Sequence, residues 1–130
     1  MRDFRKLQVW QKAHRLTLEV YRLSKRFPKE EMFGLTSQLR RATASISANI
    51  AESCGRQGES EFSRFLHIAA GSACEAEYHM LLAHELEYLP KRNYDLLNAG
   101  VCEVKRMLTA LIQKVKKQSA FSNQRSDSRS

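Results

Sequence analysis

The side chains best suited to chemistry are the carboxylates and imidazoles that gather in the segment 75–85. This segment holds Glu75, Glu77, His79, His84 and Glu85. Helical bundles that bind two iron ions use a Glu-x-x-His repeat on paired helices, and this spacing is missing here. The outer segments of the chain add too few ligands for the other half of such a site, namely His14, Glu19, Asp95 and Glu103. We therefore expect no metal site and no metal cofactor.

Motifs for nucleophilic catalysis and phosphate binding are equally lacking. Cys54, Cys74 and Cys102 lie far apart and form neither a CxxC pair nor a disulfide framework, so we expect small buried or half-buried residues. The turn GRQGES at 55–60 lacks the GxxxxGK[ST] spacing of a phosphate-binding loop. No Ser-His-Asp or Cys-His set stands out. The sequence therefore predicts no catalytic residues, no enzymatic activity and no cofactor.

The elements that would position any site follow from the apolar pattern and the scarcity of chain breakers. Only five glycines and two prolines occur among 130 residues, which favours long helices over β-strands. Phe27 precedes Pro28, Thr36 and Ser60 are suitable N-caps, and Pro90 interrupts the chain again. Apolar residues recur at helical spacing in four segments, which are 9–27, 36–55, 60–87 and 93–117.

Short connections make consecutive helices antiparallel, so we predict an all-α, up-down-up-down four-helix bundle. The bundle would occupy residues 1–117 as a single domain. Residues 118–130, QSAFSNQRSDSRS, are polar and aperiodic, and we expect a disordered tail. No run approaches the roughly 20 apolar residues of a membrane span, and the basic N-terminus lacks the apolar stretch of a signal peptide. We expect the protein to be cytoplasmic.

Positive charge is concentrated in the first and last thirds of the chain, whose formal net charge is +8. Residues 1–26 carry eight Lys or Arg against two acidic residues, a net charge of +6, and residues 91–117 carry seven against two, a net charge of +5. Residues 27–90 carry five against nine, a net charge of −4. Because the first and last helices of such a bundle are neighbours, the two basic segments would share one positive face.

Such a face would bind the phosphates of RNA or DNA by counterion release and would not read sequence by itself. Its candidate contact residues are Lys12, Arg15, Arg22, Lys25, Arg26, Lys105, Arg106 and Lys114. One alternative is a solvated basic surface without a partner. Another is an oligomeric scaffold that docks an enzyme partner, for which the small residues Gly71, Ser72 and Ala73 would permit close helix approach. Binding that survives high salt would favour the scaffold.

A second, polar stripe runs along the two central segments. If these fold antiparallel about the turn at 55–60, residues whose numbers sum to about 116 face each other. The resulting pairs are Glu52 with Arg64, Ser45 with Ser72, Arg41 with Glu75 and Gln38 with His79, and Asn49 lies in the same stripe. Such a network would fix the register of the helices. The alternative is a ligand-binding or subunit interface.

The same central segments resemble a known family. The relevant runs are FPKEEMFGLTSQLRRATASISANIAESCGR at 27–56 and FSRFLHIAAGSACEAE at 62–77, and Val9, Trp10 and Ala13 fit upstream. They resemble the four helix bundle protein family, whose members include proteins encoded in intervening sequences of bacterial large-subunit ribosomal RNA genes. The resemblance covers about residues 4–117.

This resemblance implies a four-helix bundle without established enzymatic activity. Related proteins are similar to the accessory variability determinant of diversity-generating retroelements, which forms a basic homopentameric barrel and binds a reverse transcriptase and nucleic acid. By this resemblance we expect a homo-oligomer, with a pentamer as the expected assembly. We further expect nucleic acid as a non-specific partner, a protein as a second kind of partner, and no membrane. The retroelement role is not carried over, because one chain does not show its genomic neighbours.

Overall fold

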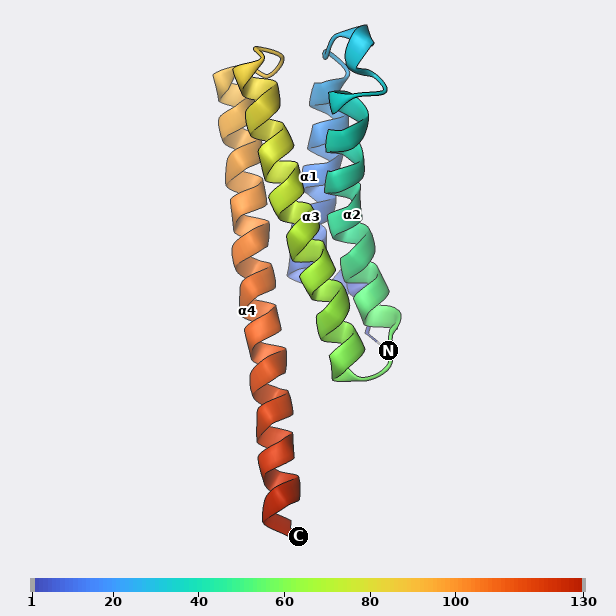
Figure 1. Cartoon of the computed structure of the whole chain (residues 1–130), viewed down its shortest axis with the longest axis vertical. Helices are drawn as coiled ribbons and strands as arrows, with labels where there is room; N and C mark the ends of the chain where they lie inside the picture. Colours follow the sequence, from blue (N-terminus) through green and yellow to red (C-terminus); the bar gives the residue numbers. More distant parts are fainter. Residues whose placement is uncertain (1, 130) are drawn as a thin grey trace.

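The computed structural model consists of helices joined by short connections (Figure 1). It describes the backbone of residues 2–129 and the side chains of residues 2–121. Within this part of the chain there is no strand, and the predicted all-α fold is confirmed. The elements are the 3-10 turns η1 (Phe4–Lys6) and η2 (Lys29–Glu31) and the helices α1 (Gln8–Ser24), α2 (Leu35–Gly55), α3 (Glu59–Glu85) and α4 (Lys91–Arg129).

The helices form a ring in which each packs against two others. α1 contacts α2 and α4, and α3 contacts α2 and α4, with the α2–α3 contact the most extensive. In the diagonal pairs, α1 with α3 and α2 with α4, no Cα atoms of the described residues lie within 8 Å of each other. Consecutive helices run in opposite directions (Figure 1). The arrangement is the predicted up-down-up-down bundle, with α1 beside α4.

The core is built from one apolar stripe on each helix. On α1 the stripe begins at Val9 and ends at Leu23, with buried residues every three or four positions. Four of the eight buried residues of α3 are alanines, and Ala69, Ala73 and Ala76 have no exposed surface. Because the distance between helix axes depends on the side chains at the contact, these alanines allow α3 to lie close to its neighbours.

The helix ends differ from the sequence-based prediction by a few residues. α1 ends at Ser24, and Phe27 is buried beyond the helix. Thr36 lies inside α2, which begins at Leu35, so Thr36 is not the N-cap. Ser60 is also inside its helix, because Gly58 is the N-cap of α3. Gly58 has φ +82°, a conformation that glycine adopts without steric penalty.

The α1–α2 and α3–α4 connections meet at one end of the bundle. Tyr88 Oη donates a hydrogen bond to Glu31 Oε2 at 3.0 Å, and the rings of Tyr88 and Phe27 lie 5.8 Å apart. Leu89 is buried beside them in the same connection. These contacts join the two helical hairpins at a defined position, which places α1 beside α4.

α4 projects past the other helices at the end of the bundle that holds the N-terminus (Figure 1). It continues to Arg129, whereas the sequence pattern predicts a disordered tail from residue 118. Residues 118–129 contain no proline or glycine to end the helix, and this explains the difference. Ser130, the last residue of the predicted tail, lies outside the described residues.

Candidate nucleic-acid interface

The predicted basic face begins on the flank of α1 that points toward α4. Lys12 Nζ lies 3.2 Å from Glu103 Oε1 of α4, so the side of α1 that carries Lys12 lines the α1–α4 seam. Arg15, Arg22 and Arg26 follow Lys12 at steps of three, seven and four residues. These steps place Lys12, Arg15 and Arg22 along one flank of α1, and Arg26 follows in the turn after the helix. The role of these side chains as contact residues stays a prediction.

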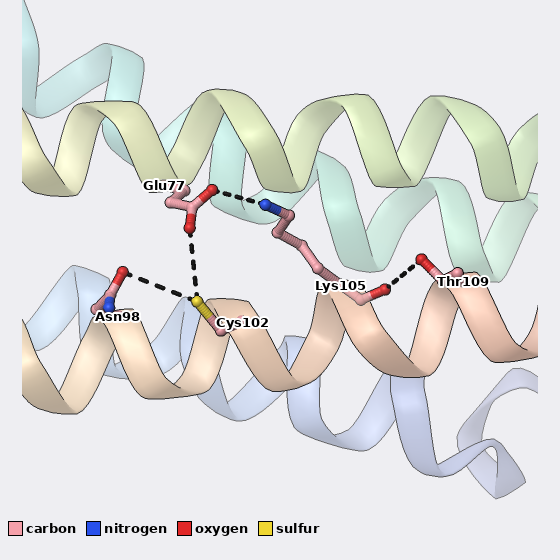
Figure 2. A network of polar contacts seen from close by, with 5 residues as sticks. All are labelled: Glu77, Asn98, Cys102, Lys105 and Thr109. Carbon is pink, nitrogen blue, oxygen red and sulfur yellow. Dashed lines mark hydrogen bonds and ion pairs between the residues drawn. The ribbon is translucent and has the colours of Figure 1, made fainter.

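α4 contributes less to this face than the sequence predicts. Lys105 turns toward α3, where its Nζ donates a hydrogen bond to Glu77 Oε1 at 2.8 Å (Figure 2). Arg106 and Lys114 are both exposed to solvent. Because Lys12 lies beside Glu103 and the two helices are antiparallel, the start of α1 falls beside about residue 107. Lys114 therefore lies on the part of α4 that extends past α1.

Acidic neighbours neutralise part of the predicted positive charge. Lys12 and Lys105 are held by the carboxylates of α4 and α3 described above, and Arg22 pairs with Glu19 on its own helix. The other predicted contact residues are exposed and have no acidic partner within the described part of the chain, namely Arg15, Lys25, Arg26, Arg106 and Lys114. A neighbouring carboxylate offsets the attraction of a cation for a phosphate. The unpaired cations are therefore the stronger candidates for phosphate contact.

Glu77 is the centre of a polar network across the α3–α4 seam (Figure 2). Its Oε2 lies 3.5 Å from Cys102 Sγ, while its Oε1 binds Lys105. The hydrogen bond from Lys105 lowers the pKa of the Glu77 carboxyl, against the opposing effect of burial. Burial, followed by the hydrogen bond to Glu77, raises the pKa of the Cys102 thiol. The thiol therefore stays protonated at neutral pH, and the network joins two helices without activating a nucleophile.

The residue types of Glu77 and Lys105 do not distinguish them from other surface charges, so sequence reasoning missed this network. The only feature of the sequence that could have indicated this network is the register of the two helices. An antiparallel α3 and α4 folded about the turn at 86–90 would bring Glu77 near Cys102, by the same counting that pairs the two central segments.

The α2–α3 seam contains one of the predicted polar pairs at hydrogen-bond distance. The hydroxyls of Ser45 and Ser72 lie 2.8 Å apart. Asn49 Nδ2 donates to the backbone oxygen of Ser45 at 2.8 Å and to its Oγ at 3.0 Å. The predicted Ser45–Ser72 contact is therefore confirmed, and Asn49 supports it from the next turn of α2.

The predicted Glu52–Arg64 pair is replaced by pairs between residues three or four positions apart, in which Arg56 directly follows α2. Glu52 binds Arg56 at 2.7 Å, and Arg64 binds Glu61 at 2.9 Å. Both arginines also lie over the ring of Phe65, at 4.9 and 4.5 Å from its centroid. Partners three or four residues away on one helix are reached at lower entropic cost than a partner on another helix, and this explains the correction.

The predicted Arg41–Glu75 and Gln38–His79 pairs are likewise not formed within the described residues. Glu75 Oε1 instead lies 3.5 Å from Nε2 of His79. His79 is buried, and neither of its ring nitrogens has a hydrogen-bond partner in the structure. Arg41, Gln38 and Glu75 line an open polar groove of about 400 Å³ above the Ser45–Ser72 pair. The register prediction thus placed these residues on one seam and gave the correct partner for Ser45, but not for the charged side chains or for Gln38.

These features define an all-α helical-bundle protein with charged seams, in which no three His, Cys, Asp or Glu side chains of the described chain gather as a metal site. The model of the 23S rRNA-intervening sequence protein family matches residues 5–110, and the chain belongs to this family. The resemblance seen in the sequence is therefore confirmed. No described helix is both long enough and apolar enough to cross a bilayer.

One solved structure shows how far the similarity extends. It is a protein of unknown function of the S23 ribosomal protein family from Bacteroides thetaiotaomicron. The two proteins are 28% identical with a TM-score of 0.75, over 80% of this chain and 97% of that chain. A search of curated proteins finds no match.

Replacing Glu77 with Gln should destabilise the protein at neutral pH but not in acid. Because the folded-state pKa of Glu77 lies below its unfolded value, its contribution is present above the unfolded pKa and is lost as pH falls through the folded pKa. Urea unfolding of wild type and E77Q at a series of pH values should give free energies of unfolding that converge as the pH falls below the ordinary pKa of a glutamate. Glu52→Gln is the control, since its pair with Arg56, four positions along the chain, is exposed and is worth about 0.3–0.5 kcal/mol. Equal losses in E77Q and E52Q would contradict the role of Glu77.

A double-mutant cycle should detect coupling between Ser45 and Ser72 and not between Arg41 and Glu75. The first pair shares a hydrogen bond, for which we expect a coupling of about 0.5–1.5 kcal/mol between Ser45→Ala and Ser72→Ala. Arg41→Ala and Glu75→Ala should be additive in the same chemical-unfolding assay. Strong coupling of the charged pair would show that the predicted ion pair forms in solution.

Proposed function

We propose that this protein is a non-enzymatic, cytoplasmic, homo-oligomeric protein that binds the phosphates of RNA or DNA through basic side chains of α1 and α4. The carrying observation is that five of the predicted contact residues are exposed and have no acidic partner in the described part of the chain. This set, the unpaired basic set, consists of Arg15 of α1, Lys25 and Arg26 directly after α1, and Arg106 and Lys114 of α4.

The unpaired basic set supports phosphate binding because its charge is available without breaking an ion pair. Each phosphate contact releases counterions and adds about −0.7 to −0.9 to the slope of log affinity against log salt. If all members of the set made contact, the slope would be about −4 for each protein chain. Lys12, Arg22 and Lys105 would add less to it, because Glu103, Glu19 and Glu77 offset their charge.

The arrangement of aromatic side chains favours phosphate contact over base stacking by aromatic rings. Trp10 is stacked on His14 at 4.8 Å and meets the edge of Phe4 at 4.9 Å. One face of its ring is therefore occupied by His14 within the protein. Tyr21 is partly covered by the guanidinium of Arg40, 4.9 Å from its centroid. Binding of this kind would be largely independent of sequence.

The family name supplies the first nucleic acid to test. It refers to intervening sequences of 23S rRNA, so a structured RNA is the natural first probe. Self-association would strengthen weak phosphate binding, because several copies of the basic face would engage one nucleic acid together. The pentamer is the assembly that the sequence resemblance implies.

A protein-docking scaffold is the second candidate function, and one observation favours it. Phe33 is 94% exposed, and Met32 beside it is 56% exposed. Adjacent exposed apolar side chains in a connection are typical contact points for a protein partner. Of the small residues considered for close helix approach, Gly71 is exposed, while Ser72 is engaged with Ser45 and Ala73 is buried. Partner binding through Met32 and Phe33 would depend only weakly on salt.

Charge reversal on α1 and α4 should weaken RNA binding and reduce its salt dependence. We expect the Arg15→Glu, Arg106→Glu double variant to reduce the slope of log affinity against log salt by about 2 relative to wild type. Fluorescence anisotropy with a labelled structured RNA and with duplex DNA across a salt series measures this slope. Arg41→Glu, compared with Arg15→Glu alone, is the matched control, since Arg41 is an exposed, unpaired arginine on the far side of the bundle. No binding by wild type at low salt would contradict the proposed function.

The purified wild-type chain should be larger than a monomer in solution. Light scattering coupled to size-exclusion chromatography should give a mass about five times the monomer mass of 15.0 kDa, as expected for a pentamer, after nuclease treatment to remove bound nucleic acid. A monomer mass at all concentrations would contradict self-association. In that case, phosphate binding would be tested on the monomer, which carries one copy of the basic face.

A further inference from the structure

A groove opens on the outer side of the α1–α4 seam, within the basic face. It has a volume of about 260 Å³ and is lined by Leu16, Leu96, Leu97 and Gly100 together with charged side chains. Leu16 and Leu97 are buried and form its floor, whereas Leu96 keeps 55% of its surface exposed at the opening. Pockets for drug-sized ligands measure about 300–1,000 Å³. The groove is therefore suited to a single flat ring system.

Gly100 keeps this groove open. A Cβ atom at position 100 would lie 3.0 Å from Leu16 Cδ1, which is closer than ordinary van der Waals contact. Glycine destabilises the interior of a helix relative to alanine, and a glycine in the middle of a helix usually has a packing or functional reason. Here it lets α1 approach α4 while it adds no side-chain atoms to the groove.

The charges around the groove leave one cation available. Lys12 is held by Glu103 at 3.2 Å across the seam, and Glu19 is held by Arg22. Arg15 also lines the groove and has no acidic partner in the described residues. The groove thus combines an apolar floor with one free guanidinium. A nucleotide has the complementary chemistry, since a base has apolar ring faces and its phosphate is an anion.

We propose that the α1–α4 groove receives an unstacked nucleobase of a single-stranded nucleic acid, with a neighbouring phosphate bound by Arg15. The proposal rests on the phosphate-binding function proposed above and adds a preference to it. A base inside a duplex is stacked on both faces and cannot enter the groove, whereas bases of single strands and loops are free to do so. Apolar side chains hold extruded bases in other nucleic-acid-binding proteins. The protein would therefore favour single strands and loops over duplex.

The test uses two exposed leucines of almost equal exposure. Leu96 lines the groove, whereas Leu18 lies on α1 outside it and is 56% exposed. Wild type, Leu96→Ser and Leu18→Ser would be titrated with a labelled oligoribonucleotide, single-stranded or annealed to its complement, at one low salt concentration. Removing the apolar contact in L96S should weaken single-strand binding about 5- to 10-fold and leave duplex binding unchanged. L18S should change neither affinity.

A fluorescent 2-aminopurine in the single strand gives an independent readout. Its emission should change on binding to wild type and L18S, because the base leaves its stacked neighbours, and should change much less with L96S. Both variants replace exposed side chains, so thermal unfolding should match wild type.

Three outcomes would overturn the groove assignment. In the first outcome, wild type binds single strand and duplex with equal affinity, and L96S and L18S bind the single strand equally well. This result would reject the groove as a base-binding site and leave the proposed phosphate binding intact. A lower oligomer mass in L96S with unchanged single-strand affinity would identify the groove as an interface between copies of the chain. A wild type that binds neither nucleic acid would reject the proposed function first, and the groove assignment with it.

Discussion

The close approach of α3 to both of its neighbours is the constraint on which the polar seams depend. It follows from the buried alanines of α3, since Ala69, Ala73 and Ala76 have no exposed surface. Larger side chains at these sites would separate the helices or cost about 1–3 kcal/mol in strain. At the present spacing the hydroxyls of Ser45 and Ser72 meet at 2.8 Å. Apolar packing therefore sets the distance between α2 and α3. The Ser45–Ser72 hydrogen bond forms at that distance and favours one register of the two helices.

Ion pairing decides which charges of this basic protein remain available. The net charge of +8 is a property of composition, but several lysines and arginines of α1 and α4 face carboxylates in the folded chain. Lys12 joins α1 to α4, and Lys105 joins α4 to α3. These pairs help to align the helices and at the same time remove cations from the surface that would meet phosphate. The contacts that stabilise the bundle thus shape the basic face.

Much of the fold could be predicted from the sequence, and less of the candidate site. Helical periodicity located all four helices, and antiparallel counting located the Ser45–Ser72 contact. The same counting was wrong for Glu52 with Arg64, because each found a partner three or four positions away along the chain. Short polar side chains can reach only across the seam or to their own backbone, so register fixes their partner. Long charged side chains reach several partners, and register alone does not choose among them.

By itself the sequence determined the number and order of the helices, the residues of the core and the place of the chain in its family, because these depend on local periodicity and residue type. Only the tertiary structure decided which charges are paired, that Lys105 faces α3, and that a groove with an apolar floor opens beside Gly100. These features depend on distances of a few ångströms between side chains far apart in the chain. Such distances follow from how the helices pack, which periodicity does not specify.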